Sequence, residues 1–348
     1  MNRKIIALVF TAFSFLPLTS FADTLSTTPS KDTAPVAVVA PVCDLARLPS
    51  INAVWLWDST IVTDDPASST KRADFFKFAT DQGINTVYVS SYGIITGKSD
   101  DNKAKLADFI SQAHSSCINT ELLAGESNWA DRKNIFKVIN FVNEAIDFTN
   151  SLSGPKPTAI HLDVEPYADK SWNTNGGANR PAIANKYLNM LSSVDVLLKG
   201  TNIDLNVDIP SSFDTANGIS SIARGKEAKS LAAFVIDIAD TTTVMGFRDT
   251  AYDVYDATKG EMNYASSVGK KVVIGLETKC FANPNEQIFT FCGSREIGTV
   301  DAPQTLIKGL EYMKGEVTKI IELENLNTYT KTFSGFAYHQ YETFSLLK

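Results

Sequence analysis

The sequence predicts an α/β fold in the form of a single (β/α)8 TIM barrel, and three observations lead to this prediction. Short apolar runs of strand length alternate along the chain with segments of helical periodicity. The alternation extends over roughly 300 residues, which suits one barrel better than two separate domains. No G-x-G-x-x-G motif follows a predicted strand, as it would in an open doubly wound sheet that binds a dinucleotide.

The predicted strands are rich in β-branched and aromatic side chains, which favour extended backbone. They cover residues 53–57, 85–90, 120–124, 158–164, 203–209, 242–247, 271–276 and 334–339. Between them, apolar residues recur at helical spacing and predict helices over residues 73–80, 103–115, 132–148, 182–198, 226–238, 255–267 and 303–323. The sequence stops at Lys348, soon after the last strand, so we expect the final outer helix to be short or missing.

The N-terminal segment predicts export. Arg3 and Lys4 precede an apolar run, and small residues lead to Ala22, which is typical of a secretory signal peptide over residues 1–22. The apolar run is too short for a membrane span, and no later stretch reaches the roughly 20 apolar residues that a spanning helix needs. We therefore expect a secreted or periplasmic protein without a membrane span.

The next segment, residues 23–45, is rich in Ser, Thr, Pro and Ala and predicts a flexible leader, because it cannot bury enough apolar surface to fold. The barrel domain is then expected over residues 46–348. Removal of the signal peptide takes away two cations and no acids, so the formal net charge moves from −7 to −9. An acidic chain without a run of Lys and Arg is not expected to bind nucleic acid.

Four cysteines lie after the signal peptide, an even count that suits an oxidising compartment. Cys280 and Cys292 enclose one short segment, so we expect a disulfide between them, which leaves Cys43 to pair with Cys117. The alternative, a thiolate metal site, lacks the paired C-x-x-C spacing that such sites use. We therefore predict disulfides, and neither a metal nor a cofactor.

The segment from Ile160 to Pro166 carries the strongest indication of function. Strand side chains alternate between faces, so His161, Asp163 and Glu165 share one face. Three ionisable groups on one face of an apolar strand are costly to bury without a function. A structural reading remains, in which the acids form a polar layer paired with a cation.

In a (β/α)8 barrel the active site lies at the carboxyl ends of the strands. Acidic and aromatic side chains gather at the predicted ends, and we take them as candidates for binding substrate: Asp58, Trp129, Tyr167, Asp208, Phe247, Arg248, His339 and Tyr341. Glu277, at the end of strand seven, is a catalytic candidate beside Asp163 and Glu165. Arg248 has two interpretations, since it could pair with a carboxylate of the substrate or with Asp249.

Two carboxyl groups that flank a bond are what glycoside hydrolysis requires, one to protonate the leaving oxygen and one to attack or to stabilise the transition state. Neighbouring acids also raise each other's pKa, so that one of them stays protonated near neutral pH. The sequence therefore predicts a glycan, either a polysaccharide or an oligosaccharide, as the partner.

The residues from His161 to Pro166 resemble the fourth-strand D-x-D-x-E signature of family 18 chitinases, and the residues from Met245 to Asp249 resemble their sixth-strand M-x-Y-D. The resemblance implies that Glu165 is the general acid and Asp163 its partner, with Met245 and Phe247 lining the floor of the site. His161 stands where the family has its first Asp, and Phe247 stands where it has Tyr.

The same region is similar to retaining glycosidases that carry an acid/base Glu before Pro on strand four and a nucleophilic Glu on strand seven. Glu165 and Glu277 occupy those positions. Both resemblances imply that Glu165 is the acid, and they disagree about the nucleophile, which stays open here.

Two alternatives to a glycan-cleaving hydrolase remain. The first is a carbohydrate-binding barrel that has lost catalysis, which the substitutions at His161 and Phe247 favour. The second is a metal-dependent hydrolase in which His161, Asp163, Asp208 and His339 gather a divalent ion, although these residues lack the compact spacing of zinc sites.

Overall fold

The computed structural model describes residues 50–348, apart from residues 66, 217, 300–301, 327–328 and 330. The predicted signal peptide, the predicted leader and the first residues of the predicted barrel domain lie outside the described residues. Within the described part, no helix is long and apolar enough to cross a membrane.

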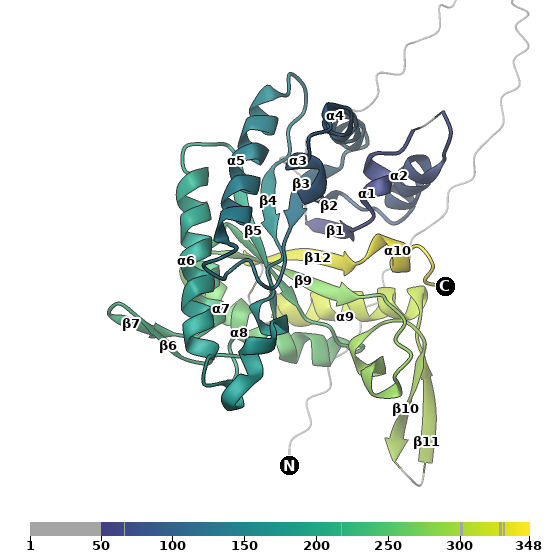
Figure 1. Cartoon of the computed structure of the whole chain (residues 1–348). Helices are drawn as coiled ribbons and strands as arrows, with labels where there is room; N and C mark the ends of the chain where they lie inside the picture. The colour runs from purple at the N-terminus through teal and green to yellow at the C-terminus, as the bar shows by residue number, and fades with distance from the viewer. Residues whose placement is uncertain (1–49, 66, 217, 300–301, 327–328, 330) are drawn as a thin grey trace, which may run out of the picture. The chain divides into compact units, whose positions relative to one another are not determined.

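Eight parallel strands close into a barrel, which confirms the predicted fold class (Figure 1). Their order around the barrel is β1-β12-β9-β8-β5-β4-β3-β2. The strands are β1 (Ile51–Leu56), β2 (Thr86–Ser90), β3 (Asn119–Ala124), β4 (Ala159–Leu162), β5 (Asp204–Pro210), β8 (Thr241–Met245), β9 (Lys271–Glu277) and β12 (Phe333–His339). Each overlaps one predicted strand.

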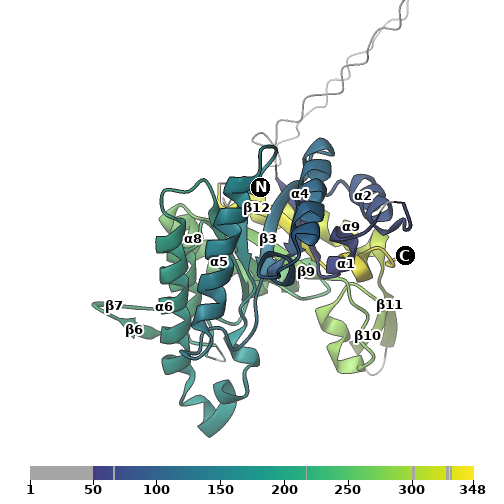
Figure 2. The same cartoon turned by 45° about the horizontal axis from the view of Figure 1, so that its top comes forward.

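Helices follow the strands and cover the outside of the barrel, as Figure 2 shows from a second side. The longer ones are α2 (Lys71–Asp81), α4 (Asp100–Ser115), α5 (Ile135–Ser151), α6 (Arg180–Leu198), α7 (Leu231–Ile238), α8 (Ala251–Val268) and α9 (Leu310–Leu326). Shorter helical turns are α1 (Ser59–Val62), α3 (Tyr92–Ile95), η2 (Pro166–Ala168), η3 (Lys170–Gly177) and η4 (Pro284–Phe289). After β12 the chain forms α10 (Tyr341–Phe344), so the final outer helix is short, as predicted.

Two predicted helices begin later than the sequence indicated, because a β-hairpin occupies the start of each segment. Strands β6 (Ile222–Arg224) and β7 (Glu227–Lys229) precede α7, which begins only where the Ser230 side chain accepts a hydrogen bond from the Ala233 amide at 3.1 Å. Strands β10 (Ser294–Thr299) and β11 (Ala302–Ile307) likewise precede α9. Both hairpins project from the helical layer (Figures 1 and 2).

The inside of the barrel is filled by side chains rather than open. Trp55 and Tyr88 pack edge to face inside it with ring centroids 5.2 Å apart. Gly275 leaves room for this indole, since a Cβ there would lie 3.3 Å from Trp55 Cη2. Burial of a large apolar side chain stabilises a fold by about 1.5–3 kcal/mol.

Candidate active site

The strand-four acids lie where β4 ends and its chain turns outward. The Asp163 amide still donates to the Ala124 carbonyl at 3.0 Å, so the inward alternation continues past Leu162 to Asp163 and Glu165. The segment after β3 requires glycine at position 125, because a Cβ on this residue would collide with the Asp163 carbonyl. This close approach brings the ends of β3 and β4 together at the carboxyl side of the barrel.

His161 lies below these acids and is fully buried between two carboxylates. Its Nδ1 is 2.7 Å from Glu121 Oε2, and its Nε2 is 2.7 Å from Asp208 Oδ1. Burial disfavours the charged imidazole, but the charge of Asp208 and the hydrogen bonds to both acids prevail and raise the pKa of His161 to about 10. The Tyr88 ring lies 3.9 Å from this cation, and Trp55 Nε1 donates to Asp208 Oδ2 at 2.9 Å.

Glu121 was not predicted as part of the site. A sequence signal was present, since the strand Asn119–Ala124 is buried apart from its first residue and Glu121 is its only charged side chain. An acid that is only 5% exposed in such a strand needs a partner, and His161 provides it. This carboxylate and Asp208 enclose the imidazolium in a buried ionic layer beneath the acids.

Asp163 and Glu165 are the carboxyl groups with raised pKa in this part of the barrel. Burial raises the pKa of Asp163 well above its ordinary value, and the charges of Asp208 and Glu165 add to the effect. Its Oδ1 is buried and accepts no hydrogen bond from the residues that the structure describes. The carboxyl of Asp163 is therefore favoured in its neutral form.

Glu165 is half-buried, and burial again raises its pKa above the ordinary value. The Tyr167 hydroxyl donates to Glu165 Oε1 and lowers the pKa in part. The charge of Asp208 raises it further. Glu165 is thus a partly accessible carboxyl at the end of β4 that holds its proton more strongly than an ordinary glutamate.

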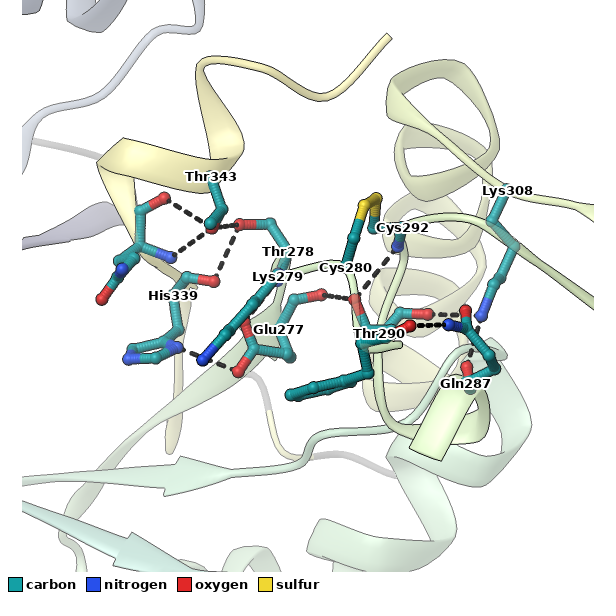
Figure 3. The surroundings of a disulfide bond; sticks show 12 residues. Glu277, Thr278, Lys279, Cys280, Gln287, Thr290, Cys292, Lys308, His339 and Thr343 are labelled. Atoms are coloured by element: carbon teal, nitrogen blue, oxygen red, sulfur yellow. Dashed lines mark hydrogen bonds and ion pairs between the residues drawn. A yellow bond between two sulfur atoms is a disulfide. The ribbon is translucent and has the colours of Figure 1, made fainter. Parts of the chain in front are cut away.

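Glu277, at the end of β9, has a different environment, which Figure 3 shows. Its Oε1 accepts hydrogen bonds from the amides of Thr278 at 2.9 Å and Lys279 at 2.8 Å. Its Oε2 lies 3.0 Å from His339 Nδ1, and His339 Nε2 accepts a hydrogen bond from Trp57 Nε1 at 3.3 Å. Since the indole only donates, His339 must carry its proton on Nδ1. Glu277, His339 and Trp57 form a chain of hydrogen bonds, which we call the relay.

The segment after Glu277 is fastened to it. The predicted disulfide between Cys280 and Cys292 is present, with Cα atoms 4.9 Å apart (Figure 3). The Phe291 amide donates to the Glu277 carbonyl at 2.9 Å. Of the second predicted pair, Cys43 lies outside the described residues, so its bond to Cys117 stays a prediction.

Arg248 does not pair with Asp249, which was one of its two interpretations. Asp249 is bound instead by Arg295, at 2.5 and 3.0 Å, and by Lys308 at 3.2 Å. These ion pairs attach the β10–β11 hairpin to the end of β8. The Arg248 guanidinium donates to the Phe247 carbonyl at 2.7 Å and lies 5.1 Å from the Phe289 ring centroid.

Some of the remaining predicted residues lie at the carboxyl ends of the barrel strands, which we call the mouth, and others pack in the core. At the mouth, Met245 ends β8, and the Phe247 ring lies 5.7 Å from the His339 ring. Asp58 follows β1 and caps α1 by accepting from the Thr60 amide at 2.9 Å. One aromatic prediction needs correction, because Trp129 is 1% exposed and packs on Tyr92 of α3. The partly exposed Tyr341 packs on Phe75 and Phe78 of α2, and its role in binding stays a prediction.

The two histidines of the site, His161 and His339, are poorly placed to bind a metal. Both ring nitrogens of His161 are engaged with carboxylates, and both of His339 are engaged by the relay. Among the described residues, no group of three His, Cys, Asp or Glu side chains is arranged to hold an ion. A cavity of about 540 Å³ lies at the opposite end of the barrel, where β4 and β5 begin, which in this fold is the structural rather than the catalytic side.

Comparisons with known proteins give only distant similarities to solved structures. No family model matches the sequence, and no curated protein matches it. Among solved structures, a chitinase of Chromobacterium violaceum ATCC 12472 is 12% identical, over 84% of this chain and 95% of its own, with a TM-score of 0.48. A family 18 chitinase of Pseudoalteromonas aurantia is 10% identical over 84% and 94%, with a TM-score of 0.49. The spore cortex-lytic enzyme SleL of Bacillus cereus is 12% identical over 84% and 71%, with a TM-score of 0.47.

The closed order of the eight parallel strands, rather than these similarities, defines the class. The chain has a (β/α)8 barrel fold. Which bond it acts on, and with which residues, has to be argued from the side chains described above.

Proposed function

We propose that this protein hydrolyses the glycosidic bonds of a glycan, with Glu165 as general acid and Asp163 as its partner. One observation carries the proposal. At the end of β4, two neighbouring inward carboxyls have a raised pKa; both residues are partly exposed, and Asp163 Oδ1 is buried. An acid that stays protonated near neutral pH is what departure of a sugar oxygen requires.

In the proposed reaction, Glu165 donates its proton to the glycosidic oxygen as the bond from that oxygen to the anomeric carbon breaks. Water supplies the hydroxyl group that the anomeric carbon gains, and its remaining proton returns to Glu165. A carboxyl kept neutral by burial can donate a hydrogen bond, so Asp163 would hold an acceptor oxygen of the substrate in place.

The surroundings of Glu277 favour a supporting role over that of nucleophile. Its two oxygens accept from two backbone amides and from His339, and the side chain is 5% exposed. A carboxyl group held by three donors has little freedom to approach a substrate. We therefore assign Glu277 to the relay.

The rival function, glycan binding without turnover, is favoured by Phe247. This ring lies beside His339 and carries no hydroxyl to hold the substrate, where family 18 chitinases have Tyr. The two functions differ in whether the proton of Glu165 is ever transferred.

Export to an oxidising compartment is part of the proposal. The disulfide between Cys280 and Cys292 is the kind of bond that persists outside the cytosol, which supports the predicted signal peptide. N-terminal sequencing of the mature protein after expression in a bacterium would test cleavage after Ala22.

The proposal is tested with aryl glycosides and with β-1,4-linked oligomers of N-acetylglucosamine, glucose and xylose. We expect turnover by the wild-type protein and a loss of about 10²- to 10⁴-fold in kcat for Glu165→Gln, the usual contribution of a general acid. Oligomer binding without any turnover by the wild-type protein would instead support the binding barrel.

A further inference from the structure

We propose that Trp57 is a stacking platform for a pyranose ring and that Glu277 acts through His339 to fix the orientation of its indole. The inference rests on the proposed function, because it gives the glycan a binding surface in the same site. Trp57 directly follows β1, two residues after the buried Trp55.

Trp57 differs from the other tryptophans of the chain in exposure. The chain has four, and all lie in the described part. Trp55, Trp129 and Trp172 are exposed by 1%, 1% and 2%. Trp57 is partly exposed and rests on the buried aromatic cluster inside the barrel. It is the one indole of the four that has an accessible surface for a ligand.

The relay holds this indole from its polar edge. Trp57 Nε1 donates to His339 Nε2 at 3.3 Å, and His339 Nδ1 donates to Glu277 Oε2 at 3.0 Å. Glu277 is itself fixed by the amides of Thr278 and Lys279. A core tryptophan needs at most one acceptor for its N–H group, whereas this arrangement fixes the ring plane from the end of a second and a third strand. Pre-organisation of this kind reduces the entropy lost on binding.

The indole is also near the proposed acid. His339 lies close enough to Glu165 to interact with it electrostatically, and the Phe247 ring lies 5.7 Å from the His339 ring. Trp57, His339 and Phe247 therefore belong to the same mouth as Glu165. An aromatic face beside an acid suits the C–H face of a sugar whose glycosidic oxygen the acid would protonate.

The ligand expected from this chemistry is a β-linked sugar with equatorial hydroxyls, as in glucose or N-acetylglucosamine. Such a ring presents a flat C–H face, which packs on an indole, and a polar rim. A sugar with an axial hydroxyl on that face would lose part of the contact. We therefore expect glucose-type oligomers to bind more tightly than galactose-type oligomers.

The test measures tryptophan fluorescence during titration with the oligomers named above, in Glu165→Gln protein so that the ligand stays intact. We expect a change in emission in that protein. Trp57→Ala should abolish the change and weaken binding about 10- to 100-fold by calorimetry, the equivalent of losing one good aromatic contact. Trp172→Phe is the matched control, because it removes a buried indole and should keep both the fluorescence change and the affinity.

The positioning role is tested by a double-mutant cycle. In Glu277→Gln, the amide oxygen must accept from the two backbone amides, so the amide nitrogen faces His339 Nδ1 and forces the proton to Nε2. Nε2 then no longer accepts from Trp57. We expect a several-fold loss of affinity, and we expect this loss to vanish when Trp57→Phe is also present, since Phe has no N–H group.

Each outcome separates the inference from the proposed function. Oligomer binding that Trp57→Ala leaves unchanged would overturn the platform, even if the wild-type protein cleaves glycans. A Trp57-dependent fluorescence change without any turnover would support the platform and overturn the hydrolase. No binding by any oligomer would overturn the platform. An equal effect of Glu277→Gln with Trp and with Phe at position 57 would overturn the relay.

Discussion

The end of β4 and the end of β9 both carry acidic side chains, but the hydrogen bonds that these acids accept differ. At β4, Asp163 and Glu165 are acids with raised pKa, and Asp163 Oδ1 is buried without a hydrogen bond from the described residues. At β9, Glu277 has three donors on its two oxygens. Position at a strand end is common to both regions, so our assignment of Glu165 as the acid and Glu277 as a support rests on the difference in burial and hydrogen bonding.

The largest expected effect tests this contrast directly. Glu165→Gln should lower kcat by about 10²- to 10⁴-fold because it removes the transferable proton. Glu277→Gln should act mainly on KM, since its carboxylate only orients His339 and Trp57. Steady-state kinetics on the best oligomer of the panel would measure both. A loss in kcat for Glu277→Gln as large as that for Glu165→Gln would make Glu277 the nucleophile and break the contrast.

The buried layer under the acids gives the next effect. His161→Gln leaves Glu121 and Asp208 without their cation, and removal of one partner from a buried ion pair typically costs about 3–5 kcal/mol. We expect a loss of this size in the free energy of unfolding, measured with urea at pH 6. The matched control is His114→Gln on α4, where the ring is exposed and the change should stay within about 0.5 kcal/mol.

The same pair of proteins has a defined pH dependence. The pKa of His161 is about 10 in the folded protein against an ordinary 6.5, so its stabilising contribution is complete below pH 6.5 and declines as the pH rises toward about 10. The difference in stability between wild type and His161→Gln should shrink over that range. A difference that stays constant from pH 6 to pH 10 would show that the imidazole is neutral throughout.

Removal of the disulfide between Cys280 and Cys292 should have a smaller effect, limited to the surroundings of Glu277. The disulfide holds the segment that follows β9. It closes a separation of 12 residues, for which the loop-entropy estimate is about 3 kcal/mol. In a protein with both cysteines replaced by serine, the Phe291 amide, which donates to the Glu277 carbonyl, should exchange faster with deuterium. The Asp163 amide, which donates to Ala124, should keep its protection. Equal loss of protection at both amides would mean that the disulfide stabilises the whole barrel.

The sequence predicts the fold well because each strand carries its own period and composition. All eight predicted strands overlap those of the barrel. The starts of α7 and α9 were predicted too early, because 226–229 and 303–307 have helix-compatible composition yet pair as hairpins with residues before them. Pairing between segments is not contained in local periodicity.

The site was less predictable, for a related reason. The alternation of side chains between the two faces of β4 identified His161, Asp163 and Glu165, because this pattern can be read within a single strand. The partner of His161 is 40 residues away on β3, and Trp57 is joined to His339 across 282 residues. Sequence spacing also cannot tell that Trp129 fills the core while Trp57 reaches the mouth, since both are tryptophans near a strand end.

The smallest effect concerns the Tyr167 hydroxyl, which donates to Glu165 and lowers its pKa. In Tyr167→Phe this stabilisation of the carboxylate is lost, so the folded-state pKa of Glu165 rises further above its ordinary value. The proposed acid is active when protonated, and activity is lost as the pH rises through that pKa. The alkaline limb of the kcat profile should therefore move to higher pH in the variant. A limb that moves to lower pH, or stays in place, would mean that the group titrating there is not Glu165, and the acid would then have to be sought among the other carboxyls of the mouth.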